Sequence, residues 1–129
     1  MGTGTKLNRN EPSQSESMPG FEGRYTREDG YIFGFESFEE AGDFTPMYRG
    51  LPDDLCQSHH WGYVIKGRMI MHRPEGDIVV EEGEAYYVGP GHTGEVGLPG
   101  TQVIEFSPAA EYDQTMAVLA KNIEAASSD

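Results

Sequence analysis

The sequence predicts an all-β domain, a sandwich or barrel of many short strands. Glycine and proline together supply 25 of the 129 residues (17 Gly and 8 Pro), which is too turn-rich for a helix bundle. From Tyr25 onward, turn signals recur about every 8–12 residues, and the runs between them are rich in aromatic and β-branched side chains. A chain of 129 residues with 36% hydrophobic content can build one domain around one core.

The individual strands are expected between these turns. Residues 31–35 are aromatic-rich, and residues 61–65 form a second strand candidate. The runs 68–72 and 78–81 flank a Pro- and Gly-containing turn at residues 74–77, which predicts a hairpin. The remaining strand candidates are residues 85–88, 95–96 and 101–106.

The two ends of the chain differ from this central part. Residues 1 to about 20 are mostly Gly, Thr, Asn, Ser, Pro and Glu, and such a segment cannot bury enough apolar surface to offset its ordering entropy. We therefore expect a disordered N-terminal tail at residues 1–24 and a single folded domain at residues 25–129. Near the C-terminus, residues 112–126 fit either one helix or a closing strand followed by a helix.

The chain is strongly acidic, and the acidity belongs to the predicted domain. Nine Lys and Arg residues stand against 22 Asp and Glu, a formal net charge of −13, while the charges within residues 1–24 cancel. Phosphate backbones and anionic lipids repel such a domain, so we expect neither a nucleic-acid nor a membrane partner. The sequence also has no apolar run near the ~20 residues that span a bilayer.

The cysteine count indicates the redox environment. Cys56 is the only cysteine, which excludes an internal disulfide framework. The first 24 residues lack the apolar core of a secretory signal. A reducing cytoplasm is therefore the expected compartment.

Residues that suit a metal gather in one part of the chain, because all four histidines and the cysteine lie within residues 56–92. Cys56 and His60 share one face of an extended chain, so both side chains can point into a barrel interior. His92 follows a Gly-Pro-Gly corner, where glycine lets the backbone approach a ligand closely. Thiolate and imidazole suit zinc, iron, nickel or copper. Cys56, His60 and His92 are therefore the predicted ligands of a divalent transition metal.

Each of these residues also has an ordinary structural alternative. Cys56 could be a small buried hydrophobe, His60 a hydrogen-bonded core histidine and His92 a loop histidine. His59 lies on the opposite strand face to His60 and is expected at the surface. His72 lies beside a hairpin turn and is expected to be solvated.

Glu105 interrupts a mostly apolar strand. With a two-residue period it shares a face with Val103, while Ile104 and Phe106 share the other face. A half-buried carboxylate there could hydrogen-bond to a metal-bound histidine, or it could face outward. The sequence leaves both orientations open.

These residues resemble the motifs of the cupin superfamily, small β-barrels whose interior holds a metal or a small ligand. The first motif of that superfamily is G-x5-H-x-H-x3,4-E-x6-G. Gly67 matches its final glycine, and His60 stands at the glutamate position. Cys56 and Asp54 stand at the second and first histidine positions. The resemblance implies a double-stranded β-helix, the cupin or jelly-roll barrel, with a short C-terminal helix.

The second cupin motif, G-x5-P-x-G-x2-H-x3-N, is matched in part. Gly83 and Gly91 agree with it. The departures are Gly89 at the proline, Gly94 at the histidine and Leu98 at the asparagine. His92 lies two residues before the histidine position, so on a strand it can face the same side.

The chain is similar over about residues 25–120 to a group of small, single-domain bacterial cupins. The segments that carry this similarity are residues 51–56, 60–67, 83–93 and 105–108. In that group a second cysteine usually stands where this chain has Ser58, and a proline where it has His59. Serine is a much poorer ligand for a soft metal than cysteine. By analogy with the family, the protein is expected to form a homodimer.

Cupin resemblance does not fix an activity, because the barrel hosts isomerases, dioxygenases, sugar-binding sensors and storage proteins. One hypothesis is a metal-dependent dioxygenase, isomerase or lyase that uses zinc, iron, nickel or manganese on a small oxygenated substrate. The second hypothesis is a non-catalytic protein that binds or senses a small ligand without metal. In the third, Cys56 and the histidines only pack the barrel.

Overall fold

The computed structural model describes residues 3–127 as ten strands, two short 3-10 turns and one helix. The strands are β1 Gln14–Met18, β2 Phe21–Glu28, β3 Tyr31–Phe38, β4 Gly42–Asp43, β5 His60–Lys66, β6 Arg68–His72, β7 Ile78–Glu81, β8 Ala85–Val88, β9 Thr93–Val96 and β10 Thr101–Pro108. The 3-10 turns are η1 Thr45–Tyr48 and η2 Pro52–Asp54, and the helix is α1 Ala109–Ser127.

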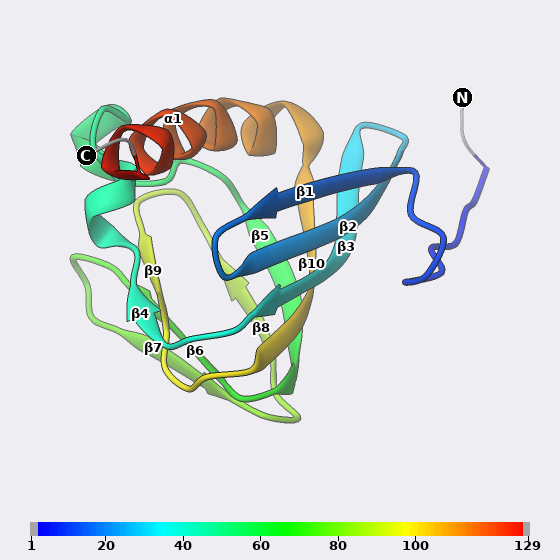
Figure 1. The fold of residues 1–129 in the computed structure, drawn as a ribbon, viewed down its shortest axis with the longest axis horizontal. Coiled ribbons are helices and arrows are strands. Elements are labelled where there is room, and N and C mark those ends of the chain that lie inside the picture. Colours follow the sequence, from blue (N-terminus) through cyan, green and yellow to red (C-terminus); the bar gives the residue numbers. More distant parts are fainter. Residues whose placement is uncertain (1–2, 128–129) are drawn as a thin grey trace.

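The strands form two antiparallel sheets that face each other as a barrel (Figure 1). The larger sheet has the order β1-β2-β3-β10-β5-β8, and the smaller has the order β4-β9-β6-β7. Helix α1 follows β10 directly and packs against η1, β3 and β10. The predicted all-β fold with a C-terminal helix is confirmed, and the predicted hairpin at residues 68–81 is present as the β6–β7 pair.

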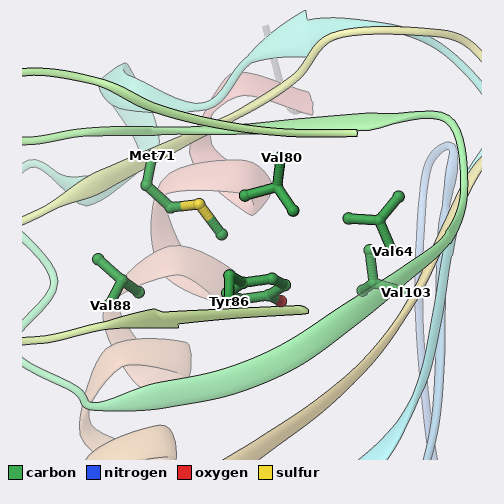
Figure 2. Close-up of a cluster of buried hydrophobic side chains, with 6 residues drawn as sticks. All are labelled: Val64, Met71, Val80, Tyr86, Val88 and Val103. Carbon is green, nitrogen blue, oxygen red and sulfur yellow. The ribbon is translucent and has the colours of Figure 1, made fainter. Parts of the chain in front are cut away.

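The core lies between the two sheets because alternate residues of each strand point inward. Figure 2 shows side chains of the smaller sheet, Met71 and Val80, opposite Tyr86 and Val88 of the larger sheet. Val64 is fully buried beside them. Each buried side chain of this size stabilises the fold by roughly 1.5–3 kcal/mol relative to exposure.

Two tyrosines lie flat over glycines on the inner face of the larger sheet. Tyr86 of β8 is opposite Gly62 of β5, and Tyr25 of β2 is opposite Gly34 of β3. A Cβ atom on either glycine would overlap the tyrosine ring. The glycines therefore leave the space that lets both hydroxyl groups reach into the barrel.

The N-terminal expectation is wrong in part. Residues 14–18 form β1 and pair with β2, which begins at residue 21, so residues 14–24 belong to the larger sheet rather than to a disordered tail. The prediction was wrong because it relied on the low hydrophobicity of this segment. An edge strand is held mainly by backbone hydrogen bonds and needs few apolar side chains. Residues 1–2 lie outside the described residues.

The C-terminal region is one helix and contains no closing strand. Its apolar side chains, Tyr112 and Met116, pack against Tyr25 and Ile32 of the larger sheet. Within residues 3–127, no helix combines the length and the apolar character that crossing a bilayer requires.

Replacing Gly62 with alanine tests the tyrosine-over-glycine packing. The new Cβ would overlap the Tyr86 ring and lie 2.7 Å from the backbone oxygen of Ile104. We expect Gly62→Ala to lower the free energy of unfolding by about 1–3 kcal/mol, the usual cost of overpacking. Gly42→Ala is the matched control, because nothing lies within 4 Å of the added atom. Chemical denaturation that finds equal stabilities for the two variants would contradict this packing.

Candidate metal centre

A backbone bridge brings Cys56 and His92 together although 36 residues separate them. The Cys56 amide donates to the His92 carbonyl at 2.7 Å, and the Gly91 amide donates to the Cys56 carbonyl at 2.7 Å. Gly91 has a φ of +97°, which glycine adopts readily and most residues avoid. Both side chains are buried, with 1% exposure for Cys56 and 3% for His92.

His60 completes a group of three potential ligands. It is the first residue of β5, and its Nε2 atom lies 3.6 Å from the Cys56 sulfur. The ring centroids of His60 and His92 are 5.2 Å apart. One ligand atom from each of the three residues lies within 4.8 Å of the others. The structure therefore brings all three predicted ligands to one point.

Both imidazole rings are held by their Nδ1 atoms. His92 Nδ1 donates to the carbonyl oxygen of Gly89 at 2.7 Å, which leaves the lone pair on Nε2. His60 Nδ1 lies 2.6 Å from the Ser107 hydroxyl and 3.2 Å from a Glu105 carboxylate oxygen. A histidine held through one ring nitrogen presents the other as a metal ligand in a fixed orientation.

Burial sets the protonation of these groups. Burial lowers the pKa of His60 to about 4. Burial and then the neighbouring His60 lower the pKa of His92 to about 4. Both rings are therefore neutral at pH 7, the form that binds metals. Burial raises the pKa of the Cys56 thiol, whose sulfur lies 3.3 Å from the Thr115 hydroxyl.

The spacing of these atoms fits a tetrahedral metal. An ion that holds sulfur at about 2.3 Å and nitrogen at about 2.1 Å separates those two atoms by about 3.6 Å. This is the distance between the Cys56 sulfur and His60 Nε2. One thiolate and two imidazoles also match the ligand preference of the borderline-soft divalent metals. Three protein ligands leave a position for water or substrate.

Two carboxyl groups lie beside this trio. Glu105 faces inward, which decides between the two orientations left open by the sequence, and its Oε2 atom accepts a hydrogen bond from the Tyr86 hydroxyl. Glu36 of β3 accepts a 2.6 Å hydrogen bond from the Tyr25 hydroxyl. Burial raises the pKa of both carboxyls, and the charge of Glu105 raises that of Glu36 further.

Sequence reasoning missed Glu36. The predicted strand ended at residue 35, whereas β3 continues to Phe38. The two-residue period that places Ile32 and Gly34 inward also places Glu36 inward. A longer strand assignment was the available signal.

A cavity of about 410 Å³ joins the trio and the carboxyl pair. Both sheets, the segment of η1 and helix α1 form its wall. Most of its lining is aromatic, aliphatic or thioether: Met18, Phe21, Phe38, Phe44, Met47, Tyr48, Met69, Met71, Val88, Tyr112, Met116, Leu119 and Ile123. The site thus has the volume of a small-molecule pocket.

Ser58 and His59, which depart from the related cupin pattern, lie outside the trio. Ser58 is fully buried, but its hydroxyl donates to the His59 carbonyl at 3.0 Å. The His59 ring is 39% exposed and pairs with Glu111 at 2.9 Å. His59 therefore lies at the surface, as its strand parity predicts.

His72 is half-buried rather than freely solvated. Its Nδ1 atom lies 2.8 Å from Asp77 and its Nε2 atom 2.8 Å from Glu95. These hydrogen bonds, first Asp77 and then Glu95, raise the pKa of His72. His72, Glu95 and Asp43 form a second group of nearby potential ligand atoms, on the smaller sheet. The two carboxylates suit a protonated ring at this position.

Comparisons with known proteins agree on the fold. No protein-family model matches the sequence, and no curated protein matches it. A protein of unknown function from Rhizobium leguminosarum aligns with a TM-score of 0.61 and 14% identity, over 81% of this chain and 96% of its own. Ectoine synthase from P. lautus aligns with a TM-score of 0.58 and 8% identity, over 81% of this chain and 77% of its own. An RmlC-like cupin from Shewanella frigidimarina aligns with a TM-score of 0.51 and 16% identity, over 74% of this chain and 83% of its own.

Glu36→Gln tests the buried carboxyl pair through the pH dependence of stability. A carboxyl whose pKa is raised by folding keeps its proton in the folded state, so stability falls as pH rises above its ordinary value of about 4.5. Folding lowers the pKa of His60 and His92, so their contribution to stability rises with pH, but only between about pH 4 and 6.5. Between pH 6.5 and 8.5 we expect metal-free wild-type protein to lose stability faster than Glu36→Gln, by roughly 1–2 kcal/mol.

Urea denaturation across this pH range measures the difference. Glu75→Gln is the control, because it removes one exposed carboxylate from the β6–β7 turn. A stability difference between wild type and Glu36→Gln that stays constant with pH would show that Glu36 titrates normally.

Proposed function

We propose that this chain, which has the cupin fold, holds one divalent transition-metal ion through Cys56, His60 and His92 and acts on a small oxygenated molecule. The convergence of one sulfur and two imidazole nitrogens beside a 410 Å³ cavity carries the proposal. Zinc, iron and nickel suit a thiolate ligand better than manganese does. The ligand set needs a reduced cysteine, which favours a reducing cytoplasm.

The residues around the ion have separate tasks in this proposal. When bound, the metal would polarise a ligand oxygen or lower the pKa of a coordinated water. Ser107 and the Gly89 carbonyl fix the two imidazole rings. Glu105 stabilises partial positive charge on His60 through the Nδ1 contact. The apolar wall excludes bulk water, which strengthens each of these electrostatic interactions.

A non-catalytic ligand-binding protein is the second candidate function. The Cys56 sulfur lies 3.6 Å from His60 Nε2 and 3.3 Å from the Thr115 hydroxyl, so hydrogen bonds within the protein can satisfy this thiol. The mainly apolar lining suits binding of a small molecule by itself. A chain without stoichiometric metal that is still stabilised by a small ligand would favour this candidate.

We also propose that the protein is a homodimer formed through an outer aromatic face of the larger sheet. This face consists of the exposed residues Tyr31, Trp61, Tyr63, Ile65, Tyr87 and Phe106. Trp61 packs on Tyr87 at 5.3 Å between ring centroids, and Phe106 stacks on Phe33 at 4.9 Å.

A second copy is the occupant that this face fits best. The outward positions of β3, β10, β5 and β8 hold no carboxylate, and Lys66, paired with Gln102, is their one charged residue, although the chain carries a net charge of −13. Two copies therefore meet here without bringing carboxylates together. Aromatic enrichment with depletion of charge is typical of the core of a protein interface.

Elemental analysis of untagged protein tests the metal proposal. We expect about one zinc, iron or nickel ion per chain, and less than about a tenth of that in Cys56→Ser and His60→Ala, because each loses a ligand. His59→Ala is the matched control, since its ring pairs with Glu111 outside the cavity.

His72→Ala separates the two clusters of potential ligands. Metal that survives Cys56→Ser but disappears in His72→Ala would belong to the outer group and would contradict the proposal. Wild-type protein without stoichiometric metal would contradict it as well.

Light scattering during size exclusion tests the dimer. The chain has a mass of 14.2 kDa, so a dimer has about 28 kDa. We expect Trp61→Glu to yield monomer, because the new charge would be buried between two copies. Val79→Glu places the same charge at an exposed hydrophobic residue of β7 and should leave the dimer intact. A monomeric wild type at about 100 μM, a concentration that populates any dimer of micromolar affinity, would overturn the assignment.

A further inference from the structure

We propose that the molecule bound in the cavity carries an ammonium group, and that Glu36 and the Tyr112 hydroxyl recognise it. This inference rests on the proposed function for the position of the ligand beside the metal centre. It adds the chemical class of the ligand and assigns two recognition residues outside the metal-binding trio.

Glu36 is a carboxyl of the cavity wall that lies on β3 and that the metal centre does not use. Glu105 already has the Tyr86 hydroxyl and His60 as partners. Glu36 has one partner among the described residues, the Tyr25 hydroxyl on Oε2. Its other oxygen, Oε1, has no hydrogen-bond donor in that part of the chain, and Glu36 lines the cavity. A donor from a bound molecule would complete it.

Tyr112 provides a second, independent observation. Its side chain also lines the cavity, and the residue is only 7% exposed. Its hydroxyl is the one buried side-chain polar atom without a hydrogen-bond partner among residues 3–127. The ring lies 5.4 Å from that of Tyr25, which binds Glu36. Burial raises the pKa of Tyr112, the nearby Tyr25 hydroxyl lowers it, and the charge of Glu36 raises it, so the Tyr112 hydroxyl lies near both groups.

When its carboxyl groups are ionised, the cavity favours a cation. Its lining includes the carboxyl groups of Glu36, Asp43 and Glu105, and no lysine or arginine is among the described residues that form it. The rings of Phe21, Phe38 and Phe44 follow one another at 5.1 and 5.9 Å and add an aromatic wall. Carboxyls and aromatic faces together attract organic cations and repel anions.

An ammonium group fits both unfilled positions at once. It has three N–H donors, so it can donate to Glu36 Oε1 and to the Tyr112 oxygen together. A hydroxyl group can donate to Glu36 and accept from Tyr112, but it carries no charge to pair with ionised Glu36. A carboxylate has no hydrogen to donate and would face the charge of Glu36.

Three six-carbon probes test this inference at pH 8.5, a pH that favours ionised Glu36. The probes n-hexylamine, 1-hexanol and hexanoate share one apolar chain and differ in the head group. An alkylammonium resembles lysine, whose pKa is about 10.4, and stays charged. We expect calorimetry on the full chain to give a dissociation constant for hexylamine at least about tenfold below that for 1-hexanol, with hexanoate weakest.

Two variants assign the preference to the named residues. Glu36→Gln is expected to reduce the preference for hexylamine over 1-hexanol to less than about threefold. Tyr112→Phe removes one hydrogen-bonding oxygen and should weaken hexylamine about threefold to tenfold. Glu75→Gln removes an exposed carboxylate of the β6–β7 turn and should leave all three constants unchanged.

Equal binding of hexylamine and 1-hexanol by wild type, or a full preference in Glu36→Gln, would overturn the inference. If Glu36→Gln does not fold, Tyr112→Phe decides: weaker binding of hexylamine supports the inference and unchanged binding of hexylamine overturns it. The metal content of the same samples separates the two proposals. Hexylamine preference in a chain without metal would remove only the metal centre, and metal without head-group preference would remove only the ammonium site.

Discussion

The backbone bridge between Cys56 and His92 is the contact on which the rest of the site depends. Two hydrogen bonds of 2.7 Å join segments that are 36 residues apart in sequence, and the positive φ of Gly91 makes the close approach possible. This bridge fixes where the sulfur and the His92 ring enter the barrel. The His60 ring then needs only its place at the start of β5 to join them.

Buried polar groups decide how the interior is arranged. An unpartnered buried hydrogen-bonding group costs about 1–3 kcal/mol, so the fold supplies a specific partner for nearly every one. The Gly89 carbonyl and Ser107 serve the two imidazoles, and the tyrosines that lie over glycines serve the two carboxyls. The positions left without partners, at Glu36 and Tyr112, face the cavity, where a ligand can fill them.

The sequence predicted strands in the places of β3 and β5 to β10, because these depend on local patterns, and it predicted that Cys56, His60 and His92 converge. It did not predict β2 or β4. Apolar alternation marked β5 to β8, and the spacing of Cys56 and His60 indicated one face. Edge strand β1 was not predicted because its side chains are polar and its stability comes from backbone pairing with β2. Glu36 and Tyr112 were not predicted as ligand-binding residues, because this proposed role depends on a cavity that several distant segments form together.

X-ray absorption spectroscopy of the metal-loaded protein tests the central claim most directly, because it reports the atoms bound to the ion. We expect one sulfur at about 2.3 Å and two imidazole nitrogens at about 2.0–2.1 Å, as for zinc, with the remaining position filled by a light atom. A spectrum with only oxygen and nitrogen neighbours, and no sulfur, would contradict it.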